Sequence, residues 1–264
     1  MKTDTTMRWL LLTIIGASWV FVSVSNGQTT NVTSNIAGFQ VVTLIEGRNF
    51  VGMPVIPATN TLAGIMSTNQ LPAAATESSA TAVDFWDQTH QTLTNRSWLS
   101  SSANFPGWRA SSTFADNNAL LLDVNKGVIV TIRAGQGSQS LLLLGYVATN
   151  AQTQVVQNNS YTLAASTYPV AVSLTNSGLV ASGFVGGNSV GTSDTLQFFN
   201  PTTQLFDLTI WYDTGSGVWR NADGSVATRQ LMPGESFVIA RGNWVAGNFT
   251  WTNPIPASLS HGQP

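Results

Sequence analysis

The sequence predicts a mainly β protein built from two related repeats, each a β-sandwich or barrel-like unit with one short helix. Short runs rich in Val, Ile, Thr and aromatic residues alternate with Gly, Asn and Pro turn signals along most of the 264 residues. The same order of segments occurs twice. We therefore expect a first β repeat at residues 28–157 and a second at 158–264, after an N-terminal segment at 1–27 that is not part of the fold.

The N-terminal segment has the layout of a secretory signal peptide. Lys2 and Arg8 make the first residues basic, and the apolar run WLLLTIIGASWVFVSV follows at residues 9–24. Small residues then precede an expected cleavage site before Gln28. The run is shorter than the ~20 residues that a spanning helix needs, so we expect no membrane span after cleavage. The mature protein is expected to be secreted, extracellular or at the cell surface.

The composition is poor in charge and free of cysteine. Charged residues make up 8% of the chain, against about 25% in typical soluble domains. A formal net charge of −2 with few cations argues against nucleic acid as a partner, because phosphate binding needs clustered Lys and Arg. Without cysteine there is no thiolate chemistry, and the fold must be held by its core. With so few charges, electrostatic repulsion between copies of the protein is weak, which favours association.

The internal repeat is seen by aligning two stretches, DFWDQTHQTLTNRSWL at 84–99 and QFFNPTTQLFDLTIWY at 197–212. Three further pairs of segments, one upstream of this stretch and two downstream, occur in the same order in both repeats, with spacings that drift as loop insertions would make them. These pairs are ATNTLAGIMS with LTNSGLVASG, GWR with VWR, and NKGVIVTIRAG with MPGESFVIARG. The alignment predicts that Gly127 matches Gly234, and that FQVVTLI at 39–45 and SYTLAAS at 160–166 each open a repeat.

The segments QFFNPTTQ, WYD with GVW, and PGESFV in residues 197–238 carry a resemblance. Together with an opening strand and a polar TN turn, they resemble an uncharacterised family of exported, internally duplicated β proteins of verrucomicrobial-type bacteria. The resemblance implies a secreted β protein and no catalytic residues. The first repeat departs from the pattern, with NKGVIV in place of PGESFV.

The stretch IWYDTGSGVWR at 210–220 spells the catalytic loop of a pepsin-like aspartic protease. Such an enzyme needs two carboxylates that share a proton. The repeat alignment places Ser100 opposite Asp213, so the first repeat lacks the second carboxylate. The sequence therefore favours a Gly-rich hairpin turn in which Asp213 bonds its own backbone. A protease that pairs two copies of Asp213 in a dimer remains a remote alternative.

Other catalytic and metal motifs are missing. The sequence has no GxSxG, HExxH or phosphate-binding loop, and only two histidines. We expect no enzyme activity, no cofactor and no metal site. The oxygen-rich segments DQTH and FADNN leave a calcium-binding loop open as an alternative to plain polar loops.

Tryptophans are the remaining candidates for a binding surface. Four of them recur in both repeats and are expected in the core, because each repeat must fill the same space: Trp98, Trp108, Trp211 and Trp219. Trp244 and Trp251 have no counterpart in the first repeat. They are the candidates for stacking on a polysaccharide, which would make the protein a carbohydrate-binding module.

The leading hypothesis is a non-enzymatic extracellular or cell-surface protein that acts by self-association or by interaction with the envelope or matrix. The strand segments QVVTLI, SLLLLGYVAT and NFTWT carry no charge, although exposed strand edges usually carry charges that block pairing. We expect Val42 in the first segment and Thr250 in the last to lie at edges that pair between copies. Service as one domain of a larger secreted enzyme system is a further alternative.

Overall fold

The computed structural model describes residues 37–242 and 247–260. The expected signal peptide and Trp244 lie outside the described residues. Within the described part, strands arranged in antiparallel sheets dominate and the helices are few and short, so the mainly β prediction is confirmed. No helix in these two ranges is long and apolar enough to cross a membrane.

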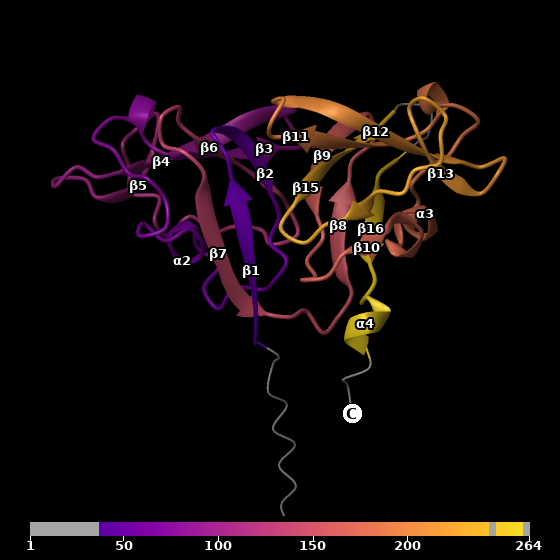
Figure 1. Cartoon of the computed structure of the whole chain (residues 1–264), viewed down its shortest axis with the longest axis horizontal. Coiled ribbons are helices and arrows are strands. Elements are labelled where there is room, and N and C mark those ends of the chain that lie inside the picture. The colour runs from indigo at the N-terminus through magenta and orange to yellow at the C-terminus, as the bar shows by residue number, and fades with distance from the viewer. Residues whose placement is uncertain (1–36, 243–246, 261–264) are drawn as a thin grey trace, which may run out of the picture. The chain divides into compact units, whose positions relative to one another are not determined.

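The first half of the fold runs from β1 to β7 (Figure 1). Five strands form an antiparallel sheet in the order β2-β6-β3-β4-β5, and β1 pairs with β7 in a separate two-stranded ribbon. The short helix α2 (Leu62–Ile65) begins where Thr61 Oγ1 accepts a hydrogen bond from Gly64 N, and η1 (Glu77–Ser79) precedes β3. The strands are β1 (Ala37–Leu44), β2 (Gly47–Val51), β3 (Ala82–Asp87), β4 (Thr92–Ser100), β5 (Gly107–Ala110), β6 (Val128–Ile132) and β7 (Gln139–Tyr146).

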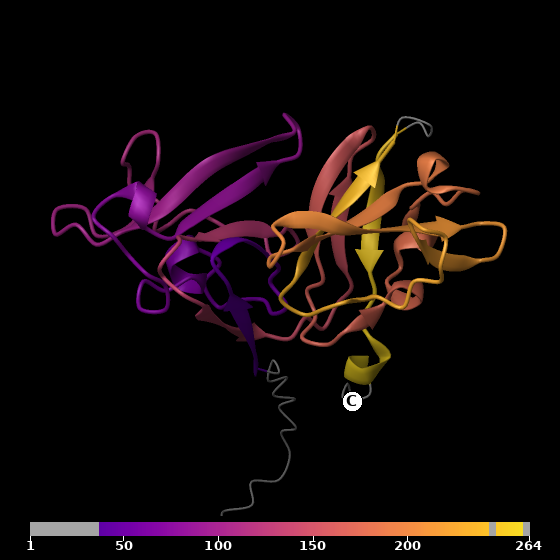
Figure 2. The same cartoon turned by 45° about the horizontal axis from the view of Figure 1, so that its top comes forward.

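The second half, drawn in orange and yellow at its C-terminal end, is easiest to follow in Figure 2. Its five-stranded sheet has the order β9-β15-β11-β12-β13, while β8 pairs with β16 and β10 with β14. Its strands are β8 (Gln152–Val156), β9 (Ser160–Ala165), β10 (Val172–Ser173), β11 (Thr195–Asn200), β12 (Leu205–Asp213), β13 (Val218–Asn221), β14 (Gln230–Leu231), β15 (Ser236–Arg241) and β16 (Phe249–Asn253). Its short helices are η2 (Leu174–Asn176), α3 (Leu179–Ser182), η3 (Val190–Thr192) and α4 (Ala257–Ser260).

Each half has its own hydrophobic core. The four tryptophans that recur in the sequence are all buried, as predicted. Trp108 lies in the core of the first half and Trp219 in that of the second. A fully buried side chain of this size contributes about 2–3 kcal/mol through removal of apolar area from water. The recurrence of Trp108 and Trp219 therefore reflects the need to fill two similar interiors, whereas Trp98 is buried in a separate small cluster with Ala80 and Ala82.

The two five-stranded sheets have the same strand order and matching registers. Ala82 pairs with Trp98 and Thr131 in the first sheet, just as Thr195 pairs with Trp211 and Ala240 in the second. Positions matched in this way are called equivalent below. Two expected alignments shift: the equivalent of Gly127 is Ser236 rather than Gly234, and β9 occupies the place of β2 rather than that of residues 39–45.

The position of β8 also moves the expected boundary between the halves. β8 pairs with β16 along Gln152–Val156, in the same way that β1 pairs with β7. A boundary after Gln157 would separate β8 from its partner strand. A boundary between β7 and β8 keeps every such pair together.

The halves contact each other through equivalent residues. Val51 bridges Glu235, and the equivalent residues Ala164 and Lys126 form the matching bridge. A Cβ on Gly127 would lie 2.3 Å from Ser236 Cβ, so glycine is needed for this approach. A small apolar cluster joins the two sheets, and its buried members are Ile129, Leu163 and Val238, with Phe50 and Trp86 packed against them.

Candidate functional site

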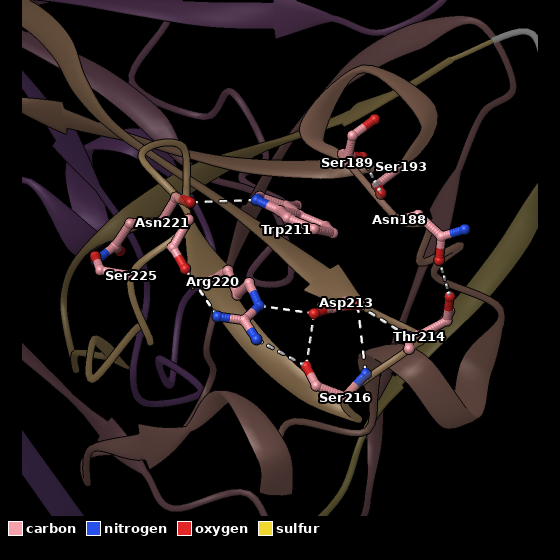
Figure 3. A network of polar contacts seen from close by, with 12 residues as sticks. Asn188, Ser189, Ser193, Trp211, Asp213, Thr214, Ser216, Arg220, Asn221 and Ser225 are labelled. Atoms are coloured by element: carbon pink, nitrogen blue, oxygen red, sulfur yellow. Dashed lines mark hydrogen bonds and ion pairs between the residues drawn. The ribbon is translucent and has the colours of Figure 1, made fainter.

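Asp213 lies in a closed network of polar contacts at the end of β12 (Figure 3). Its Oδ1 accepts hydrogen bonds from Gly215 N at 2.9 Å and Ser216 N at 3.4 Å. Its Oδ2 accepts from Ser216 Oγ at 2.6 Å and from Arg220 Nε at 2.7 Å. Arg220 also donates to Gly224 O at 2.8 Å. Both carboxylate oxygens of Asp213 are therefore engaged within its own hairpin.

These contacts determine the charge state of Asp213. The hydrogen bond from Ser216 and then that from Arg220 lower the pKa of Asp213 to about 2. An aspartic protease needs a carboxyl group that holds a proton near its working pH, which in these enzymes is arranged by a second, adjacent carboxylate. Asp213 instead has the geometry of a turn residue that caps backbone N–H groups, which is the structure predicted for it.

The tryptophan candidates for sugar binding are not brought together. Trp251 is 1% exposed, and its Nε1 donates to Ser177 O at 2.8 Å, so the expectation that it lies at the surface is wrong. Its ring faces inward because Phe249, Trp251 and Asn253 alternate with outward-facing threonines along β16. Trp244 lies outside the described residues.

The two residues expected to mark pairing edges lie in different settings. Val42 is half-buried, packs against the first core and lies against Gly234, where a Cβ would be 2.6 Å from Val42 Cγ2. Thr250 is exposed on β16. The far edge of that strand lies along α3, where Ser182 Oγ accepts from Thr252 N at 2.9 Å. β16 is therefore not the unprotected edge that the sequence suggested.

The outer face of the β1–β7 ribbon is apolar and exposed. Phe39 is 68% exposed, Leu144 61% and Val41 49%. Phe39 faces Leu144, and Val41 faces Leu142, directly across the ladder. Tyr146 extends the same face at one end. Contiguous apolar surface of this kind usually marks a site of interaction.

One edge of this ribbon is open. Tyr146 exchanges two backbone hydrogen bonds with Ile56, at 2.8 and 2.7 Å, and Leu142 N donates to Gln70 Oε1 at 2.6 Å. These backbone groups of β7 point away from β1. Because bonded and non-bonded pairs alternate in an antiparallel ladder, the backbone groups of Val41 likewise point away from β7.

By the same alternation, the backbone groups of Phe39 and Thr43 also point to the outer edge of β1, away from β7. Within residues 37–242 and 247–260, neither residue has a partner there, and Val41 O accepts only from the side chain of Gln40 at 3.1 Å. A groove with a volume of about 320 Å³ runs beside Val41 to Leu44. The edge is therefore accessible to another extended chain.

The corresponding ribbon of the second half lacks these properties. Gln88 Nε2 donates to Val155 O on the edge of β8 at 3.2 Å. The equivalent of Gln88 is Pro201, which has no side-chain donor, and among the described residues only the neighbouring Gln40 donates a side-chain bond to the outer edge of β1. The outer face of β8 and β16 carries Thr153, Thr250, Thr252 and one exposed valine, Val155.

A comparison of the chain with protein families, curated proteins and solved structures finds no match.

Proposed function

We propose that this protein is a non-enzymatic extracellular or cell-surface protein that associates with copies of itself through β1. The N-terminal sequence pattern supports export, and the low charge of the chain supports association. The similar architecture of the two halves supports an origin by duplication of one unit that contains a five-stranded sheet and a two-stranded ribbon.

The observation that carries the proposal is the difference between the two ribbons. Both occupy the same place in their halves, so the fold itself does not require an apolar outer face or an open edge there. In the second ribbon, Gln88 donates a hydrogen bond to the edge of β8, and the outer face carries threonines. The first has exposed Phe39 and Leu144 and an open strand. A surface that departs from its equivalent in this way is best explained by a partner.

A second copy fits this edge because the edge is complementary to itself. Two β1 strands can pair antiparallel about a two-fold axis that passes between the two copies of Val41, which places Phe39 opposite Thr43 of the second copy. Strands β1 and β7 contain no charged residue, so no like charges face each other in this arrangement. Pairing would join the two ribbons into one four-stranded sheet with a doubled apolar face, on which further copies can pack.

Packing of further copies on the doubled apolar face sets the expected strength of association. Burial of one Val, Leu or Phe side chain contributes about 1.5–3 kcal/mol, while association costs roughly 4–15 kcal/mol in lost translational and rotational freedom. A ribbon with a few such residues therefore predicts oligomers that form with rising concentration.

Sedimentation velocity of wild-type protein and two lysine variants tests the proposal. Val41→Lys places two like charges opposite each other at the proposed axis, which is destabilising, and should shift the protein to monomer. Thr153→Lys makes the same change in charge on the exposed face of β8 and should leave the oligomers unchanged. If wild-type protein stays monomeric at high concentration, or if both variants behave alike, association through β1 is wrong.

A further inference from the structure

A second groove lies along β8. Its place in the second half corresponds to that of the 320 Å³ groove beside β1 in the first half. The volume of the second groove is about 630 Å³, and it runs between the β3–β4 hairpin, residues 120–128 and β8. Most of its walls are amide, hydroxyl or carboxylate side chains. Its polar residues include Asp87, Asn95, Asp123, Asn125, Gln154 and Gln157.

Several of these side chains have unused hydrogen-bonding capacity. The side-chain amides of Asn95 and Gln157 have no partner among the described residues. Asn125 Oδ1 and Gln154 Oε1 also have no partner among the described residues, but both atoms are buried, so the amides open to a ligand are those of Asn95 and Gln157. Gln154 is 6% exposed, and its Nε2 donates to Leu163 O at 3.0 Å, which fixes the amide at the inner wall. Buried amide oxygens of this kind normally accept a hydrogen bond.

The groove also has an aromatic residue, Trp86, in its lining. Trp86 is partly exposed. Its Nε1 donates to Tyr161 O at 2.8 Å, so the orientation of the indole is fixed by the second half. The indole also packs against the cluster of Ile129, Leu163 and Val238, so its exposed part offers a limited apolar surface beside amides that can form directional hydrogen bonds.

The charges of the groove are few and paired. Asp87 bonds His90 Nδ1 at 2.6 Å, and Asp123 bonds Lys126 Nζ at 3.2 Å. Asp87, Asp123 and Lys126 line the groove and together carry more negative than positive charge. This arrangement disfavours nucleic acid and other polyanions, which need clustered cations.

We propose that this groove binds a neutral oligosaccharide, with the hydroxyl groups of the sugar bonded by the free amides and one ring packed on Trp86. The chemistry is not imposed by the fold, because most residues that line the groove in the equivalent place along β1 are apolar, and its charged residues, Arg229 and Glu235, are paired with each other. The sugar site is separate from the edge of β1, so it does not depend on self-association.

Isothermal titration with a panel of neutral hexasaccharides tests the proposal: cellohexaose, xylohexaose, laminarihexaose, maltohexaose and chitohexaose. At least one should bind wild-type protein. Asn95 has a left-handed backbone with φ of 51°, which glycine adopts freely, so Asn95→Gly removes the amide without strain. Combined with Gln157→Ala, this change should weaken binding at least tenfold.

Two controls separate the site from folding and from self-association. Asn69→Ala, at an exposed position that does not line the groove, should bind the sugar as wild type does. Val41→Lys should also bind it fully, because the sugar site does not use β1. Unchanged thermal unfolding of the Asn95→Gly, Gln157→Ala variant would show that it remains folded. Absence of binding to every hexasaccharide at millimolar concentration, or equal binding by the wild type and the folded double variant, would overturn the proposal.

Discussion

Gln204 binds the backbone of Arg48 across the contact between the two halves. Its Oε1 accepts from Arg48 N at 2.8 Å and its Nε2 donates to Arg48 O at 3.1 Å. Gln91 makes the equivalent pair of bonds with Tyr161, at 2.7 and 3.3 Å. Arg48 and Tyr161 lie on β2 and β9, which are the edge strands of their sheets. A side-chain amide thus takes the place of a neighbouring strand at both edges, while in the described part of the chain no amide of the other half does so for β1.

Shortening Gln204 should weaken this contact measurably. Asn tolerates the left-handed backbone that Gln204 has, with φ of 58°, but its amide is too short to reach Arg48. Gln204→Asn should lower the free energy of unfolding by about 1–2 kcal/mol, the value of one or two neutral hydrogen bonds. Urea unfolding measures the change.

The matched control for that variant is Gln230→Asn, at an exposed position on β14. It should change the free energy of unfolding by less than about 0.5 kcal/mol, as is usual for surface positions. Equal effects of the two substitutions would mean that the amide of Gln204 does not stabilise the contact between the halves.

Removal of one partner from the buried ion pair in the second half should be costly. Asp194 is 0% exposed and its Oδ2 lies 2.8 Å from Arg241 Nη1, whose guanidinium also sits 4.8 Å from the centre of the Phe249 ring. Arg241→Met leaves the Asp194 carboxylate buried without its cation, which typically costs 3–5 kcal/mol. Urea unfolding at pH 7 measures the loss.

Acid should reduce that loss. Burial raises the pKa of Asp194 above its ordinary value. A raised pKa in the folded state favours folding most at low pH, and that contribution is lost as the pH rises through the folded pKa. The Arg241 cation opposes this rise in the pKa, so Arg241→Met should raise the folded pKa of Asp194 further, and the penalty of the substitution should be smaller at pH 4 than at pH 7. Arg220→Met, which breaks a partly exposed pair, should cost at most about 1 kcal/mol; a similar cost for both variants would contradict this account.

Asp213 should influence stability in the opposite direction with pH. The hydrogen bonds from Ser216 and Arg220 lower its folded pKa from 3.8 to about 2. The contribution of the carboxylate is therefore present above pH 3.8 and is lost as the pH falls towards 2. Asp213→Asn should destabilise the protein at pH 7, and the difference from wild type should shrink as the pH falls from 3.8 through about 2. A difference that stays constant with pH, followed by urea unfolding, would show that the charge of Asp213 is not involved.

Local sequence patterns predicted the parts of this fold that depend on local spacing. Trp98 and Trp211 recur at the same place in a hairpin, and both are buried. The final strands were misaligned by two residues, a shift that keeps each side chain on the same face of the sheet and so leaves the hydrophobic pattern unchanged. The correct alignment follows only from the strand pairing, in which Thr131 and Ala240 occupy equivalent positions opposite Ala82 and Thr195.

Features that depend on contacts distant in sequence could not be predicted in this way. Val41 and Val42 are both apolar and lie in a charge-free strand, so composition does not show which of them faces outward. The inward side is set by the core and by Gly234, which is remote in the chain. The burial of Trp251 did have a local signal, since Phe249 and Trp251 alternate with Thr250 and Thr252. The polar groove had none, because its walls come from three separate segments.

Amide hydrogen exchange along β1, measured at low and high protein concentration, tests the pairing of this strand most directly. The N–H groups of Gln40 and Val42 point towards β7 and should be protected at both concentrations. Those of Phe39, Val41 and Thr43 point to the open edge. We expect them to exchange fast in dilute protein and to become protected as oligomers form. Fast exchange of these three amides at concentrations where oligomers are present would contradict association through the edge of β1.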